Sequence, residues 1–125
     1  MKYVTSYQCT LCNQTYPKDL NSMTCPACGE KGILDVLYDY EAMKETVTKQ
    51  YFKDCHEKSI LRYSPMMSIE LPDYETLSVG NTPLYKSNRL AKQLGLTSLY
   101  IKDEGVNPTA SLKDRASLVA CIKAI

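Results

Sequence analysis

The chain has 125 residues, and its 15 Lys and Arg against 14 Asp and Glu give a formal net charge of only +1. This balance argues against a basic surface for nucleic acid or for an anionic membrane. The first residues, MKYVTSYQ, contain no apolar stretch of signal-peptide length, and no later segment reaches the apolar length that crosses a bilayer. We therefore expect a cytoplasmic protein with no nucleic-acid partner and no membrane partner.

Residues 1–40 alternate short apolar pieces with turn-forming residues, which predicts small β-hairpins. Cys9 and Cys12 form one C-x2-C pair and Cys25 and Cys28 another, with twelve residues between the pairs. Two such pairs on facing hairpins can place four thiolates around a tetrahedral Zn²⁺, and four protein ligands leave no open position for catalysis. We therefore predict a structural zinc ribbon, in which the metal supplies the stability that so small a core lacks.

Other interpretations of the cysteines stay open. Free thiols or two disulfides compete with a metal site, although the absence of a secretory signal favours metal binding. Four thiolates also hold an iron centre of the rubredoxin kind, so zinc and iron both remain candidates. Pro26 and Gly29 suit the sharp turn of the second pair. Cys55, His56 and Cys121 lie outside the pattern and are assigned no role.

Residues 41–72 are predicted to form a helix and a linker. Asp39 can cap a helix through DYEAMKETVTKQYF, where apolar residues recur at roughly helical spacing. The later piece SPMMSIELPDYE carries two prolines, which favour irregular chain.

Residues 73–125 are more regular. We expect a strand at TPLYKS, a helix NRLAKQL capped by Ser87 and ended by a left-handed Gly95, a strand at SLYIKDE, and a final helix from Ser111. This order is the beginning of an α/β architecture. A parallel sheet needs more strands and helices on both faces, and the last helix would leave an apolar face uncovered. We therefore expect the chain to be the front of a longer polypeptide.

Lys113 lies close to the start of that final helix. Ser111 as N-cap and Asp114 at the third helical position would form a variant capping box, with Lys113 at the second position. A positive charge there opposes the helix dipole by roughly 0.3–1 kcal/mol, so helix stability does not explain the residue. Lys113 is then either a solvated side chain or an amine whose pKa the dipole lowers for carbonyl chemistry. Spacing leaves both interpretations open.

Three segments together carry a resemblance to a known family. VGNTPL at 79–84, LYIKDEGVNPTASLKDRAS at 99–117, and the cysteine-rich part with its trailing GILDVLYDYE at 32–41 resemble the N-terminal part of the threonine synthases. These enzymes are a branch of the fold type II pyridoxal-phosphate enzymes. The resemblance covers nearly the whole chain and is weakest over 51–77. It implies a zinc ribbon followed by the incomplete start of an α/β catalytic domain.

The resemblance also implies a reaction. The lysine of the family's S-x-K-D-R motif aligns with Lys113 and binds pyridoxal 5'-phosphate as a Schiff base. It would then move protons at the α and β carbons of the substrate, while O-phospho-L-homoserine and water become L-threonine and phosphate in threonine biosynthesis. The expected partner is this small-molecule substrate. A homo-oligomer is the assembly that we consider for the protein.

The chain departs from the family pattern at two positions, because Ala110 and Leu112 stand where glycine and phenylalanine are common. The glycine-rich loop for the cofactor phosphate and the partner of the pyridine nitrogen would come from later chain, so the 125 residues alone are expected to be inactive. Alternatives are another fold type II enzyme, such as a cysteate synthase or an amino-acid dehydratase, or a stand-alone zinc-ribbon interaction module with SLKDR on a surface helix.

Overall fold

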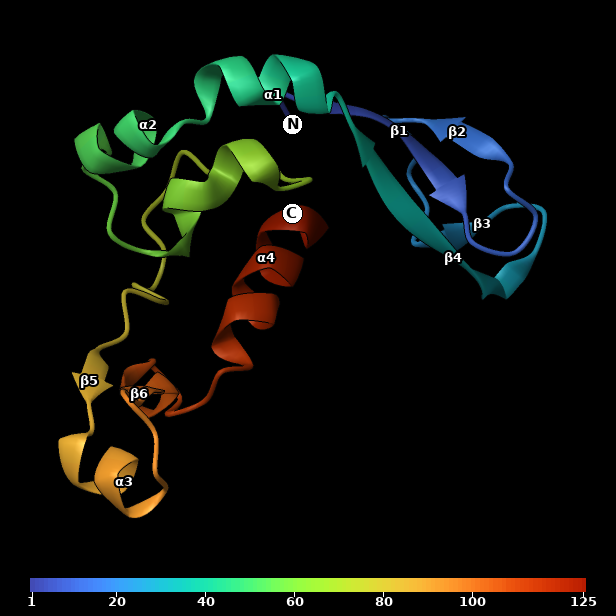
Figure 1. Ribbon diagram of the computed structural model, residues 1–125. Helices are drawn as coiled ribbons and strands as arrows, with labels where there is room; N and C mark the ends of the chain where they lie inside the picture. Colours follow the sequence, from blue (N-terminus) through green and yellow to red (C-terminus); the bar gives the residue numbers. More distant parts are fainter. The chain divides into compact units, whose positions relative to one another are not determined.

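Figure 1 shows the chain as a computed structural model that describes all residues from Met1 to Ile125. No helix combines the length and the apolar character that crossing a membrane requires. The chain forms two compact units, and each is described by itself below. The first comprises Met1–Cys55 with Tyr63–Ser68, and the second comprises His56–Arg62 with Ile69–Ile125.

A four-stranded antiparallel sheet dominates the first unit, with strand order β2-β1-β4-β3. Its strands are β1 (Val4–Cys9), β2 (Thr15–Pro17), β3 (Thr24–Cys25) and β4 (Gly29–Tyr38). The long β4 pairs with β1 from Val4 opposite Tyr38 to Cys9 opposite Leu34. Val4, Tyr7 and Cys9 of β1 are buried, together with Tyr3. The hairpins predicted for residues 1–40 are therefore confirmed.

Two short helices follow the sheet in place of the single predicted helix. Helix α1 (Tyr40–Thr46) is capped as expected by Asp39, whose carboxylate accepts a hydrogen bond from the Ala42 N–H at 3.0 Å. The chain then breaks at Val47, and Thr48 caps α2 (Lys49–Asp54) by accepting from the Tyr51 N–H at 3.2 Å. Side chains such as threonine compete with the helical backbone and favour caps, which explains the interruption.

The second unit combines short elements with long irregular segments. A 3₁₀ helix, η1 (Ile60–Met66), crosses from this unit into the first, so SPM is helical where irregular chain was predicted. The remaining elements are β5 (Leu84–Lys86), α3 (Asn88–Gln93), β6 (Tyr100–Lys102), η2 (Glu104–Val106) and α4 (Asp114–Ala124). Gly95 has φ +68°, which confirms its predicted left-handed conformation after α3. Ser87 stands at the N-cap of α3, but its side chain makes no capping hydrogen bond.

The strand–helix–strand–helix order is present, but β5 and β6 do not pair as parallel strands. They are antiparallel, with Leu84 opposite Lys102 and Lys86 opposite Tyr100. The Ser87 N–H donates to the Leu99 carbonyl at 2.9 Å, so α3 sits inside a closed loop between the strands. Every residue of both strands is exposed.

Candidate functional site

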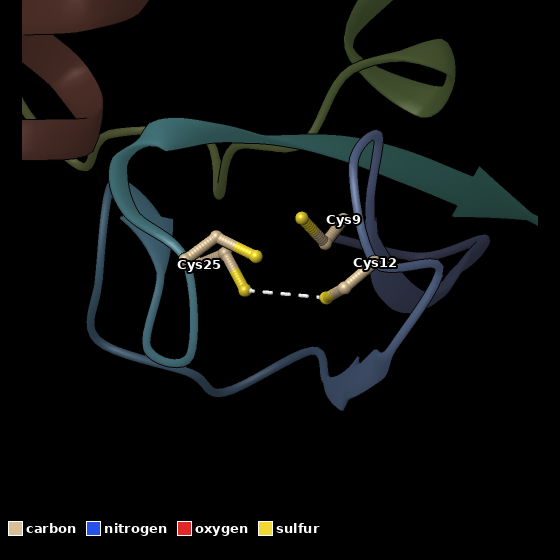
Figure 2. A group of neighbouring side chains, drawn as sticks. Cys9, Cys12 and Cys25 are labelled. Carbon is tan, nitrogen blue, oxygen red and sulfur yellow. Dashed lines mark hydrogen bonds between the residues drawn. The ribbon is translucent and has the colours of Figure 1, made fainter.

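The four cysteines of the two C-x2-C pairs converge. Their sulfur atoms all lie within 4.8 Å of one another, and Cys12 Sγ is 3.8 Å from Cys25 Sγ. In Figure 2 the side chains of Cys9 and Cys12 on one side and Cys25 on the other turn toward a common space. A tetrahedral zinc site with Zn–S bonds of about 2.3 Å has sulfur–sulfur edges of about 3.8 Å. The spacing therefore fits a four-thiolate metal centre.

Local backbone geometry produces this convergence. The turn after β1 contains Asn13 in a left-handed conformation, with φ +59°, and the Asn13 N–H donates to the Cys9 carbonyl at 3.0 Å. The Leu11 N–H lies 3.4 Å from Cys9 Sγ and can donate to a thiolate there. In the second turn Gly29 has φ +64°, as its place in CPACG predicts. Cys9 and Cys25 are completely buried, which keeps half of the cluster away from water.

Gly32 on β4 is part of the cluster, although the spacing of the cysteines did not indicate it. A Cβ atom at this position would lie 2.5 Å from the Cβ of Cys25, 2.8 Å from the Cβ of Cys28 and 3.2 Å from Cys9 Sγ. Only glycine lets β4 pass so close to three of the four cysteines. The one available signal was a glycine inside a strand, which often marks a close approach.

The thiols of Cys25 and Cys28 differ in acidity. Burial raises the pKa of Cys25, but hydrogen bonds from the Tyr16 hydroxyl and from the backbone N–H groups of Cys28 and Ala27 outweigh it and lower the pKa to about 6. The hydrogen bond with Cys12, together with burial, raises the pKa of Cys28 to about 12. Thiolates at this spacing repel one another, so all four ionise together only when a cation offsets their charge.

Lys113 lies immediately before α4, which begins at Asp114 and not at Ser111. The predicted capping box is therefore wrong. The Ser111 hydroxyl accepts from the Lys113 N–H at 3.1 Å, two residues away, within a turn that precedes the helix. The Lys113 side chain is exposed and has neither a hydrogen-bond partner nor an ion-pair partner. Its amine is thus accessible beside the N-terminus of an eleven-residue helix.

The carboxylate of Asp114 bonds to Thr109 and not to Ser111. Asp114 is buried, and its Oδ2 accepts from the Thr109 N–H at 2.8 Å while its Oδ1 accepts from the Thr109 hydroxyl at 2.5 Å. These two bonds close the segment that holds Lys113 into a short loop. The residues between Thr109 and Asp114 therefore have fixed ends, because both anchors belong to the same part-buried contact.

An ion pair between Arg115 and Glu104 also fixes this loop. Arg115 donates from Nε to Glu104 Oε2 at 2.7 Å and from Nη2 to Glu104 Oε1 at 2.8 Å, a bidentate contact. Thr82 and Asn107, both buried, donate to the same carboxylate at 2.7 and 2.9 Å. Hydrogen bonds from Arg115 first, then from Thr82 and Asn107, lower the pKa of Glu104 to about 2 although burial opposes the shift.

Asn107 joins this network to the segment VGNTPL. Its Oδ1 accepts from the Gly80 N–H at 2.9 Å, and its amide nitrogen also donates to the Glu104 carbonyl at 3.0 Å. Gly80 has φ +91°, and a side chain there would overlap Ile60. Two of the three segments that carry the family resemblance, 79–84 and 99–117, are therefore bonded to each other. The spacing of these segments in the sequence did not indicate this contact.

Comparison with known proteins agrees with these motifs. Residues 75–125 match the family described as pyridoxal-phosphate dependent enzyme. The threonine synthase of Methanosarcina acetivorans is 39% identical over 118 residues, and that of Methanocaldococcus jannaschii 38% identical over 118 residues, in both cases across 94% of this chain. A threonine synthase of Mycobacterium tuberculosis is 46% identical over 50 residues, or 40% of the chain. The chain is related to the threonine synthases.

The matched region is a small part of the threonine synthases themselves. The alignment covers 28% of the length of the two archaeal relatives and 14% of the mycobacterial one. No solved structure is significantly similar to the chain.

In the chain itself, Ala110 stands where the family commonly has glycine, and this difference has a structural consequence. Ala110 has φ +55°, the left-handed conformation in which glycine is favoured, and its N–H donates to the Asn107 carbonyl at 2.8 Å. Leu112, the second departure, is 58% exposed, so more than half of this residue beside Lys113 is open to solvent. The backbone of this loop therefore has the left-handed conformation that glycine favours, although the residue there is alanine.

Proposed function

We propose that the chain supplies the cofactor-holding lysine of a threonine synthase, an enzyme that converts O-phospho-L-homoserine and water into L-threonine and phosphate. The observation that carries this proposal is the similarity to two archaeal threonine synthases across 94% of the chain. The free, exposed amine of Lys113 fits a covalent link to the aldehyde of pyridoxal phosphate.

In this proposal Lys113 has two roles. Pyridoxal phosphate, when bound, supplies an electron sink for negative charge at the carbon that bears the amino group. Lys113 would first hold the cofactor and then, as a free amine, accept and return protons at the α and β carbons of the substrate. The hydrogen bonds from Thr109 to Asp114 and from Arg115 to Glu104 support this role, because they fix the backbone on both sides of the lysine.

The proposed division of labour follows the chain. Residues 1–40 would form a metal-binding ribbon, residues 41–72 a helical connection, and residues 73–125 the part that contributes to catalysis. We propose that zinc occupies the ribbon and that its role is structural. The 3.8 Å separation of Cys12 and Cys25, the burial of two sulfurs and the absence of a non-cysteine ligand in the group support a closed site.

The lysine assignment can be tested in a chimaera. Residues 1–125 would replace the corresponding segment of the Methanocaldococcus jannaschii threonine synthase, and release of threonine and phosphate from O-phosphohomoserine would be measured. Borohydride reduction followed by peptide mapping is expected to find the cofactor on Lys113. The Lys113→Ala variant should lose about 10²–10⁴-fold in turnover. Lys92→Ala, which removes an exposed lysine from α3, is the matched control and should retain turnover.

The outcomes separate the alternatives. Cofactor trapped on another lysine, or full turnover in Lys113→Ala, would reject the site. A folded chimaera that releases a keto acid and ammonia from serine or threonine, but no threonine from phosphohomoserine, would indicate an amino-acid dehydratase. Metal content of the purified 125-residue chain, measured by mass spectrometry of the intact protein, distinguishes zinc from iron.

A further inference from the structure

Tyr16 on β2 makes a side-chain contact with the cysteine cluster. Its hydroxyl oxygen lies 3.0 Å from Cys25 Sγ, while the ring belongs to a three-residue strand that pairs with β1. Cys25 is completely buried, so water cannot solvate the charge on its sulfur. We propose that Tyr16 is a positioning residue of the metal centre, which donates an O–H···S hydrogen bond to the Cys25 thiolate. This inference rests on the proposed four-cysteine metal site.

The direction of the hydrogen bond follows from the chemistry of a metal ligand. A metal-bound thiolate has no proton, so the Tyr16 hydroxyl must be the donor in the contact with Cys25. The hydroxyl also lies 3.1 Å from Gln14 Oε1, and it has only one proton to share. Gln14 is exposed, and water can satisfy its amide oxygen. Water cannot reach the buried Cys25 sulfur, so donation of the Tyr16 proton to this sulfur stabilises the fold more than donation to Gln14.

Such a donor changes the properties of the sulfur. An O–H donor withdraws electron density from the thiolate, which reduces its reactivity toward electrophiles and lowers the energy of its lone pairs. It also holds the Cys25 side chain in the orientation that the metal needs. Outer-shell hydrogen bonds of this type commonly affect metal affinity by about 10–100-fold. Among the four sulfurs, Cys25 is the one that contacts a tyrosine hydroxyl, so the centre is asymmetric.

The test compares the full 125-residue chain with Tyr16→Phe, which keeps the ring and removes only the hydroxyl. Tyr7→Phe is the matched control, because Tyr7 faces Tyr16 across β1 and β2 and its hydroxyl contacts Met1 Sδ at 3.7 Å. Each protein is titrated with Co²⁺, and zinc affinity is measured by competition with a chelator. Tyr16→Phe should shift the sulfur-to-cobalt charge-transfer band to lower energy and weaken zinc binding by about tenfold, while Tyr7→Phe should retain the wild-type band.

The measurements test the metal site and the role of Tyr16 separately. If the wild-type chain shows no spectrum of tetrahedral four-thiolate cobalt, both the metal site and the role of Tyr16 are overturned. If the wild-type chain binds cobalt in that geometry but Tyr16→Phe has the same band and the same zinc affinity, only the role of Tyr16 is overturned. A loss of zinc affinity without a spectral shift would also reject the hydrogen bond, because it would indicate a packing effect.

Discussion

Gly32 lies so close to the side chains of three cysteines that no larger residue fits beside them. A Cβ atom in Gly32→Ala would stand 2.5 Å from the Cβ of Cys25, so β4 or the second cysteine turn must move. We expect zinc affinity to fall by about 10–100-fold, because the ligands lose their alignment. Lys31→Ala, a change at an exposed neighbour on the same strand, should leave affinity unchanged. Equal affinities of the two variants in chelator competition would contradict this account.

Ala110 offers a test of backbone strain in which the substitution is expected to stabilise the chain. The residue is exposed and has φ +55°, so Ala110→Gly removes a steric cost of roughly 1–2 kcal/mol without exposing a cavity. The greater freedom of glycine in the unfolded chain offsets about 0.4–1 kcal/mol of that gain. We therefore expect the free energy of unfolding to rise by up to about 1.6 kcal/mol.

The same substitution in a helix provides the control for Ala110→Gly. Ala120 is exposed within α4, where glycine costs about 1 kcal/mol relative to alanine. Urea titrations of the two variants should thus move in opposite directions. Destabilisation in both would mean that the turn at Ala110 is not strained by its methyl group.

At the scale of elements, α1 is only seven residues long and depends on its N-terminal cap. Isolated helices of this length are unstable in water, so the hydrogen bond from the Ala42 N–H to Asp39 has a large relative effect. Asp39→Ala should lower the free energy of unfolding by about 1 kcal/mol. Asp39→Asn keeps an acceptor at the same position and should restore most of the loss. Thermal unfolding followed by circular dichroism checks both, and equal losses would exclude the cap as the cause.

Elements were predictable from the sequence where local chemistry determines them. The cysteine pairs, the cap at Asp39 and the left-handed Gly95 depend on neighbours within a few residues, and all three were anticipated. The split at Thr48 was missed, because a periodic apolar pattern continues across a cap that interrupts the hydrogen bonds. The start of α4 was also misplaced. Its first residue, Asp114, bonds to Thr109 in the preceding loop, which spacing alone does not reveal.

At the scale of the whole molecule, the contacts that organise each unit join distant parts of the chain. Gly32 meets Cys9 and Cys25 only because β4 folds back beside β1 and β3. Arg115 reaches Glu104 and Thr82 only because the loop before α4 returns to the segment after Val79. Such contacts require the fold itself, so the sequence indicated the candidate lysine and the candidate metal ligands but not the residues that position them.

The hydrogen bonds around Glu104 make the stability of the second unit depend on pH. The hydrogen bonds from Arg115, Thr82 and Asn107 hold the pKa of Glu104 at about 2 in the folded chain, against an ordinary value of 4.5. A carboxyl group with a lowered folded pKa stabilises the fold fully above its unfolded pKa. That contribution is lost as the pH falls from about 4.5 through about 2.

Glu104→Gln removes the titration and leaves the shape of the side chain. We expect the variant to be less stable than the wild type at pH 7, because Arg115 loses its charged partner, and the difference to shrink between pH 4.5 and pH 3. Glu75→Gln, at an exposed position of the same unit, should match the wild type at every pH. Urea titrations in chelator at each pH keep metal loss out of the comparison. A difference between wild type and Glu104→Gln that stays constant down to pH 3 would show that the carboxylate does not stabilise the fold through its charge.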